Sequence, residues 1–112
     1  MPTQREERIA KNEALFRAAN ERAADWEERR AEPAEAVELY QCECSDLACR
    51  EKMHLSRGEY ERVRSDSAHF FVAPGHEIPD VESVIEEHDG WVVVRKAPET
   101  QPIVERTDPR RG

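Results

Sequence analysis

The sequence predicts a small α+β fold, in which an N-terminal amphipathic helix precedes a zinc-stabilised domain with a short helix, antiparallel strands and a β-hairpin. Three observations support this prediction. Residues 5–31 are rich in Ala, Glu and Arg and lack Gly and Pro, which favours a helix. Residues 37–97 contain short β-forming runs separated by turn residues. All three cysteines fall between positions 42 and 49, which indicates a metal site.

Composition limits the class of protein. The chain has 112 residues, 38% of them hydrophobic and 38% charged, with a net charge of −8. A core of about 60 residues gives marginal stability, so a metal, disulfide or partner is expected. With no signal region and no membrane-spanning run, we expect a cytoplasmic protein with reduced cysteines. The acidic balance argues against nucleic-acid binding, although Arg57, Arg62 and Arg64 could form a small basic face.

We predict three parts along the chain. Residues 1–36 form the charged helix and a linker, because Pro33 within the sequence EPAEA stops the helix. Residues 37–97 form the small metal-binding α+β domain. Residues 98–112 form a disordered tail, because prolines and charges replace any apolar pattern.

Local signals place the elements of the central domain. Ser56 and Glu59 match a capping box, which predicts that a helix starts there. Asp89 and Gly90 are a strong hairpin signal between two β-forming runs. The predicted elements are strands at 37–40 and 52–55, a helix at 57–64, a buried strand at 70–72, and hairpin strands at 81–87 and 91–96.

The N-terminal helix carries a narrow apolar seam. Its members recur at spacings of 7, 3, 4 and 3, as in a coiled-coil seam: Ile9, Phe16, Ala19, Ala23 and Trp26. Such a seam could pack on its own domain, on a second copy or on a partner. Because a linker follows the helix, we predict that Phe16 and Trp26 anchor a protein partner or a homodimer.

The strongest motif is the cysteine cluster. Cys42 and Cys44 are two residues apart and project to one side of an extended chain. Ser45 and Asp46 favour a turn that brings Cys49 back to them. Three thiolates are soft ligands that suit zinc, which takes four ligands in structural sites.

The fourth ligand must come from elsewhere in the chain. His76 follows Pro74-Gly75, a turn that would hold its imidazole on a constrained backbone. His54 is nearer in sequence, and His69, Asp46 or water remain alternatives. A [2Fe–2S] cluster can also take cysteine and histidine ligands. Zinc is favoured because the third cysteine and the histidine do not follow in one compact loop.

The segments NEALFRAANER (12–22), CECSDLAC (42–49), EYERVR (59–64), FFVAPGHE (70–77) and WVVVRK (91–96) resemble a group of small uncharacterised bacterial proteins of actinobacterial type. That group carries a C-x-C-x₄-C clip and a downstream PGH turn. The resemblance implies that Cys42, Cys44, Cys49 and His76 belong to one site, and it favours His76 over His54. It implies no activity.

These patterns predict a non-enzymatic zinc-binding domain that acts as a protein-interaction or regulatory module. Four protein ligands would leave zinc no open position for catalysis. A Cys49–His54 nucleophile pair is conceivable, but nothing else in the sequence assembles a pocket around it. The alternatives are a nucleic-acid-associated transcription regulator and a thiol-based redox or metal sensor.

Overall fold

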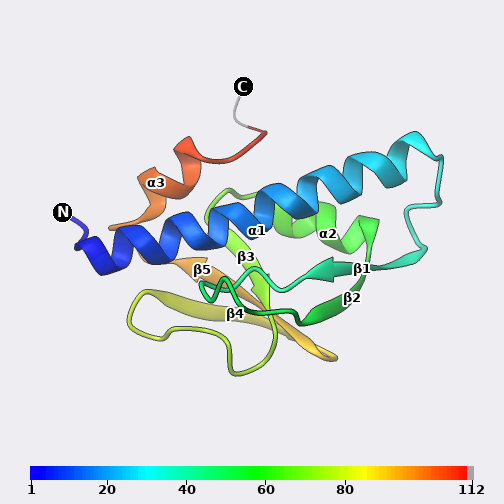
Figure 1. The fold of residues 1–112 in the computed structure, drawn as a ribbon. Helices are drawn as coiled ribbons and strands as arrows, with labels where there is room; N and C mark the ends of the chain where they lie inside the picture. Colours follow the sequence, from blue (N-terminus) through cyan, green and yellow to red (C-terminus); the bar gives the residue numbers. More distant parts are fainter. Residues whose placement is uncertain (111–112) are drawn as a thin grey trace.

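The computed structural model describes residues 1–110, which form three helices and two antiparallel sheets (Figure 1). The elements in chain order are α1 (Gln4–Arg29), β1 (Val37–Gln41), β2 (Lys52–Ser56), α2 (Arg57–Arg64), β3 (His69–Val72), β4 (Glu82–His88), β5 (Trp91–Lys96) and α3 (Gln101–Arg106). This architecture confirms the predicted α+β class. No helix in the described part of the chain is long and apolar enough to cross a membrane.

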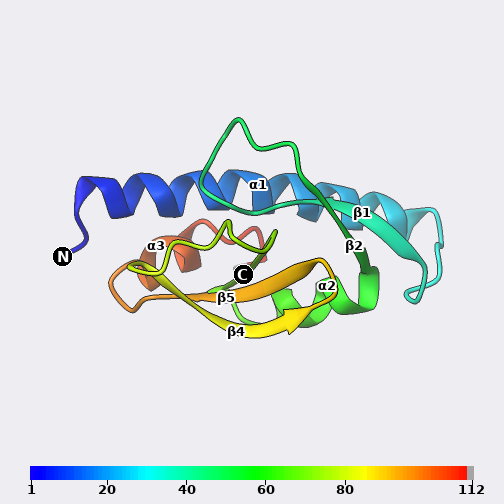
Figure 2. The same ribbon diagram turned by 90° about the horizontal axis from the view of Figure 1, so that it is seen from below.

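The strands pair in two separate sheets. β1 and β2 form a two-stranded sheet in which Tyr40 lies opposite Met53. The second sheet has the order β3-β5-β4, with β5 in the centre. Phe70, Phe71 and Val94 of this sheet are fully buried and form the middle of the core. Figure 2 shows β1 running beside the second half of α1, and the contacts of Arg17 with Phe70 and of Glu13 with Lys96 join the same helix to the second sheet.

Both predicted local signals in the central domain are present. The Ser56 hydroxyl accepts from the Glu59 amide, and the Glu59 carboxylate accepts from the Ser56 amide, which completes the capping box of α2. Gly90 adopts a φ of 84° in the turn between β4 and β5, a conformation that favours glycine. A second capping box, from Thr3 and Glu6, begins α1.

The predicted separation of α1 from the rest of the chain is wrong. One face of the helix is buried in the common core: Ile9, Ala10, Glu13, Ala14, Arg17, Asn20, Ala24 and Glu27. The Asn20 amide group exchanges hydrogen bonds with the Gln41 backbone, and Glu27 accepts from the Tyr40 hydroxyl at 2.6 Å. These specific polar contacts make α1 part of the domain, despite the intervening segment 32–36.

The predicted disordered tail is also corrected. Residues 101–106 form α3, whose Ile103 and Val104 are buried. The Val104 carbonyl accepts a hydrogen bond from the fully buried guanidinium of Arg17. Beyond the helix, Asp108 pairs with the buried Arg64 at 2.5 Å. Apolar burial and two buried arginines therefore hold this segment against α1 and α2.

A buried charge cluster connects α1 to the second sheet. The Lys96 ammonium lies 2.8 Å from the Glu13 carboxylate and 2.9 Å from the Glu82 carboxylate, and all three side chains are fully buried. Burial raises the pKa of Glu13 well above its ordinary value, and the neighbouring Glu82 carboxylate adds to this effect. One ammonium thus faces two carboxylates inside the protein.

We expect Glu13→Gln to remove a pH-dependent loss of stability. Because the folded pKa of Glu13 is raised, the folded protein holds this proton to a higher pH than the unfolded chain does. Wild-type stability therefore falls as pH rises from the unfolded pKa to the folded one, by about 1.4 kcal/mol per unit of difference. The variant should match the wild type in acid and be more stable at pH 8, as measured by denaturant unfolding. A constant difference across pH would contradict this account.

Candidate metal centre

The first two cysteines lie just after β1, in the segment that connects β1 to β2 and contacts β3 of the other sheet. The Cys42 amide donates to the Glu51 carbonyl, and the Glu43 amide donates to the Phe71 carbonyl, each at 3.0 Å. These bonds tie the segment to the residue that precedes β2 and to β3. The side chains of Cys42 and Cys44 are nearly fully buried, with 0% and 3% exposure.

Glu43 points the other way from the two cysteines and anchors the segment. Its fully buried carboxylate accepts from the Asn20 amide at 2.9 Å and from the Phe71 backbone amide at 3.4 Å. Burial raises its pKa to about 7. Asn12 adds another bond from α1, to the Ser45 carbonyl at 2.8 Å. These supporting residues could not be predicted from the sequence, because acidic and amide side chains are usually solvated.

A tight turn brings the third cysteine back beside the first two. The Asp46 carboxylate accepts from the Ala48 amide, and the Asp46 carbonyl accepts from the Cys49 amide, both at 2.9 Å. Asp46 therefore shapes the turn, as its residue type favours. Cys49 comes to lie beside the first two thiols, with 7% exposure.

The histidine reaches the site through a turn after β3. The His76 amide donates to the Ala73 carbonyl at 2.9 Å, which closes a four-residue turn. Gly75 has a φ of 89° at the third position, and Pro74 occupies the second, as in a type II turn. This turn holds the half-buried imidazole over the cysteines.

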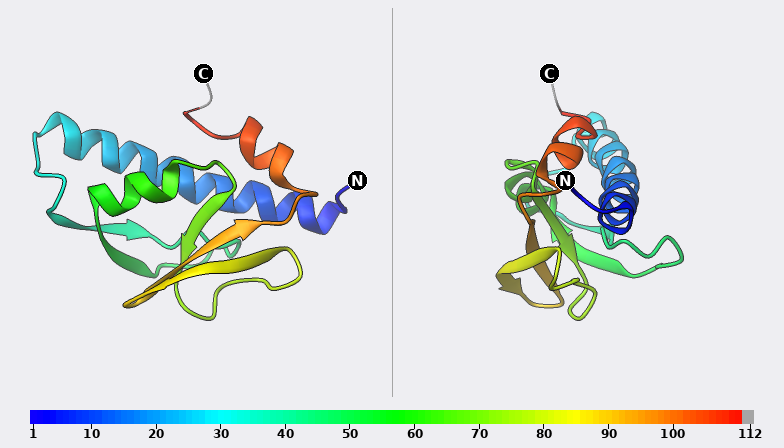
Figure 3. Two further views of the ribbon diagram at one scale, coloured as in Figure 1. Left: turned by 180° about the vertical axis from the view of Figure 1, so that it is seen from behind. Right: turned by 90° about the vertical axis from the view of Figure 1, so that its left-hand side faces the viewer.

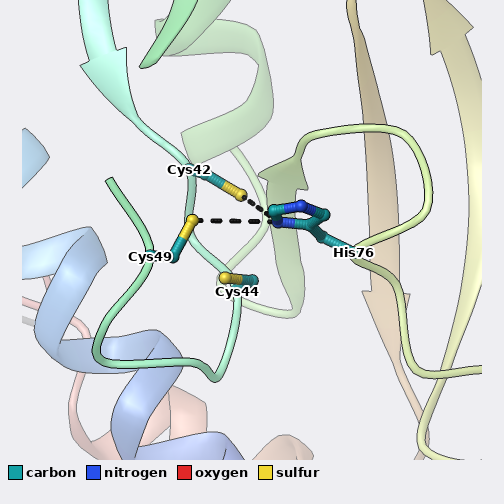
Figure 4. A group of neighbouring side chains, drawn as sticks. All are labelled: Cys42, Cys44, Cys49 and His76. Carbon is teal, nitrogen blue, oxygen red and sulfur yellow. Dashed lines mark hydrogen bonds between the residues drawn. The ribbon is translucent and has the colours of Figure 1, made fainter. Parts of the chain in front are cut away.

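The four predicted side chains converge on one point (Figure 4). The candidate ligand atoms of Cys42, Cys44, Cys49 and His76 all lie within 4.8 Å of one another. The His76 Nδ1 atom is 3.5 Å from the Cys42 Sγ and 3.8 Å from the Cys49 Sγ. The structure thus brings together three soft ligands and one imidazole closely enough to bind a metal ion.

Hydrogen bonds already favour a thiolate in this cluster. The hydrogen bond between the Cys42 and Cys44 side chains lowers the pKa of Cys44 to about 5 and raises that of Cys42. Burial raises the pKa of Cys49. The Ala73 amide donates to the Cys42 sulfur at 3.2 Å, which offsets only part of the rise in the pKa of Cys42. A bound cation would displace the remaining thiol protons.

The other histidines do not join the site. His54 is exposed on β2, opposite Leu39, and points away from the buried Met53 and Leu55 side of the strand. His69 lies 3.0 Å from Arg95 and 3.6 Å from Asp66. His88 stacks on Trp91 with a centroid distance of 3.9 Å.

The other residues that were predicted to form binding surfaces differ in their exposure and do not lie together. Phe16 is half-buried on the flank of α1, whereas Trp26 is 60% exposed. They do not form one exposed pair. The suggested basic face is not formed, because Arg64 is buried and Arg57 donates to the Glu32 carbonyl.

No protein-family model, curated protein or solved structure matches this chain.

Proposed function

We propose that this chain is a non-enzymatic, zinc-stabilised protein-interaction module. The observation that carries the proposal is the buried set of three cysteines and one histidine around a common centre. Three thiolates with one imidazole are a usual ligand set of structural zinc. The large exposed side chains of Leu15 and Trp26 on α1 support the interaction role.

The distances support a single zinc ion. With Zn–S of about 2.3 Å and Zn–N of about 2.0–2.1 Å, a regular tetrahedron separates sulfur from nitrogen by about 3.5 Å. The two Sγ–Nδ1 distances here are 3.5 and 3.8 Å. A two-iron cluster has two ligands on each iron, which spreads the ligand atoms beyond the edges of one tetrahedron. The two sulfur–nitrogen separations match one zinc tetrahedron, and all four ligand atoms lie within 4.8 Å of one another, which favours one ion over a cluster that divides its ligands between two irons.

A structural role follows from the number of ligands. Four protein ligands complete the tetrahedron, so zinc has no open position at which to activate water. The site also joins segments that are far apart in sequence, since Cys42 follows β1 and His76 follows β3. Zinc bound here would fix the two sheets relative to each other and contribute directly to folding.

Substitution of the two competing histidines tests the site. We expect His76→Ala to weaken zinc binding at least about tenfold, as loss of a ligand or even of its supporting contacts does. His54→Ala is the matched control and should leave the affinity unchanged, because His54 is exposed on the far face of β2. Competition with a chromophoric chelator measures both affinities. Equal effects of the two substitutions would contradict the assignment.

A further inference from the structure

Basic and acidic side chains lie on different sides of α1. At 100° per residue, five of the six Lys and Arg side chains of the helix fall within an arc of about 120°. They are Arg5, Arg8, Lys11, Arg22 and Arg29. The acidic residues of α1 all lie outside this arc: Glu6, Glu7, Glu13, Glu21, Asp25, Glu27 and Glu28. A cationic surface therefore lies on a protein whose net charge is −8.

Two large apolar side chains lie among these cations. Leu15 is 59% exposed and Trp26 is 60% exposed. They are 11 residues apart, which places them on nearly the same line of the helix, about 16 Å from each other. We define the α1 stripe as Arg8, Lys11, Leu15, Arg22 and Trp26. Figure 3 shows α1 at the edge of the molecule, with the sheets and the other helices on its inner side.

The cations of the α1 stripe are available for a partner. Arg5 pairs with Asp80 and Arg29 pairs with Asp25, each at the margin of the arc. Within residues 1–110, Arg8, Lys11 and Arg22 make no ion pair. An apolar groove beside Leu15 continues the surface; it is lined by Lys11, Ala14, Leu15, Ala18 and Thr107.

From this surface, we propose that the α1 stripe binds an acidic amphipathic segment of another protein. Such a segment would place two apolar side chains on Leu15 and Trp26 and carboxylates beside the cations between them. This inference rests on the proposed function and names the class of partner. Aromatic and arginine side chains together are common anchors of protein interfaces, and complementary charge steers the encounter.

The same charges argue against other occupants. In a symmetric α1–α1 dimer the stripe would face its own copy, and its cations would oppose cations. A long polyanion such as duplex DNA would meet repulsion from the rest of this acidic protein. The inner face of α1 is packed in the core, so the helix offers a membrane only two apolar side chains.

Trp26 provides a direct readout of binding. The probe is a synthetic acidic helical peptide of about 18 residues, with two leucines 11 positions apart, glutamates elsewhere on that face, and no Trp. Because Trp91 is 3% exposed, a blue shift in emission on titration reports mainly on Trp26. We expect saturable binding to the zinc-loaded full chain, with an affinity that falls as salt rises.

Matched variants distinguish specific binding at the α1 stripe from non-specific charge attraction. Arg8→Glu with Arg22→Glu should weaken binding at least about tenfold, and Leu15→Ala should also weaken it. Arg62→Glu, an exposed charge reversal on α2, should change little. Zinc content is measured on each sample, so a zinc-loaded wild-type chain that fails to bind the peptide counts against this inference alone and not against the zinc site.

Several results would overturn the inference. Equal binding of a polyglutamate of the same length would show that Leu15 and Trp26 are not anchors. Tighter binding of duplex DNA or of phosphatidylserine vesicles, abolished by the same charge reversals, would assign the stripe to nucleic acid or membrane. If sedimentation shows a dimer that Trp26→Ala dissociates, the α1 stripe binds a second copy of this chain. If none of the probes binds, the α1 stripe is not a binding surface for any of them and the inference fails.

Discussion

Removal of the metal from the cysteine and histidine site is expected to lower the melting temperature by at least about 20 °C, or to abolish the cooperative transition. Structural zinc contributes about 10–16 kcal/mol in small domains, whereas whole domains are stable by about 5–15 kcal/mol. Loss of even 5 kcal/mol shifts the midpoint of a domain of this size by about 20 °C or more. Circular dichroism after treatment with a strong chelator measures the change.

Controls with added metal ions and with a histidine variant show whether the change is due to zinc at this site. Returning one equivalent of zinc should restore the original melting curve, whereas magnesium should not, because Mg²⁺ prefers oxygen ligands. His54→Ala should respond like the wild type. Metal-free protein that keeps its melting temperature and its near-ultraviolet spectrum would show that the site does not contribute to folding.

Lys96→Met is expected to destabilise the protein by about 3–5 kcal/mol, the usual cost of breaking a buried ion pair. The Lys96 side chain is fully buried, and the substitution would leave the carboxylates of Glu13 and Glu82 without a counterion. Methionine fills a similar volume, so the loss of the ammonium dominates the effect. Urea unfolding measures it.

Two further variants identify the cause of that loss. Lys11→Met, at an exposed position of α1, should change the free energy of unfolding by no more than about 0.5 kcal/mol. Adding Glu13→Gln and Glu82→Gln to Lys96→Met should recover part of the stability, because the orphaned charges are then removed. If the triple variant is no more stable than Lys96→Met alone, the uncompensated charges are not the cause.

Local sequence patterns predicted much of this fold because local chemistry determines those elements. The Ser56 and Glu59 capping box, the Asp89-Gly90 turn and the β-forming run at 91–96 each depend on neighbouring residues only. The same holds for the cysteine cluster, where a spacing of two and a turn at Asp46 bring the thiols together.

Long-range packing could not be predicted in the same way. Glu13, Arg17 and Asn20 are charged or polar residues on a helix, where solvent exposure is the usual state. Their burial depends on partners about 20 to 90 positions away, such as Gln41, Lys96 and Val104. The apolar seam alone therefore gave the wrong inner face for α1.

The C-terminal helix was missed for a related reason. Its apolar content is the pair Ile103 and Val104, too short for a periodic signal. A buried arginine on α1 and another on α2 complete its contacts. For the site, His76 was predicted from its turn, whereas the exclusion of His54 required the register of β2 against β1.

The most direct test of the central claim is X-ray absorption at the zinc edge on the purified protein, combined with its metal content. We expect one zinc per chain, with three sulfur neighbours at about 2.3 Å and one nitrogen neighbour at about 2.0–2.1 Å. The nitrogen contribution should be lost or replaced by oxygen in His76→Ala and kept in His54→Ala. A coordination shell with fewer than three sulfurs, iron in place of zinc, or folded protein that binds no metal would contradict it.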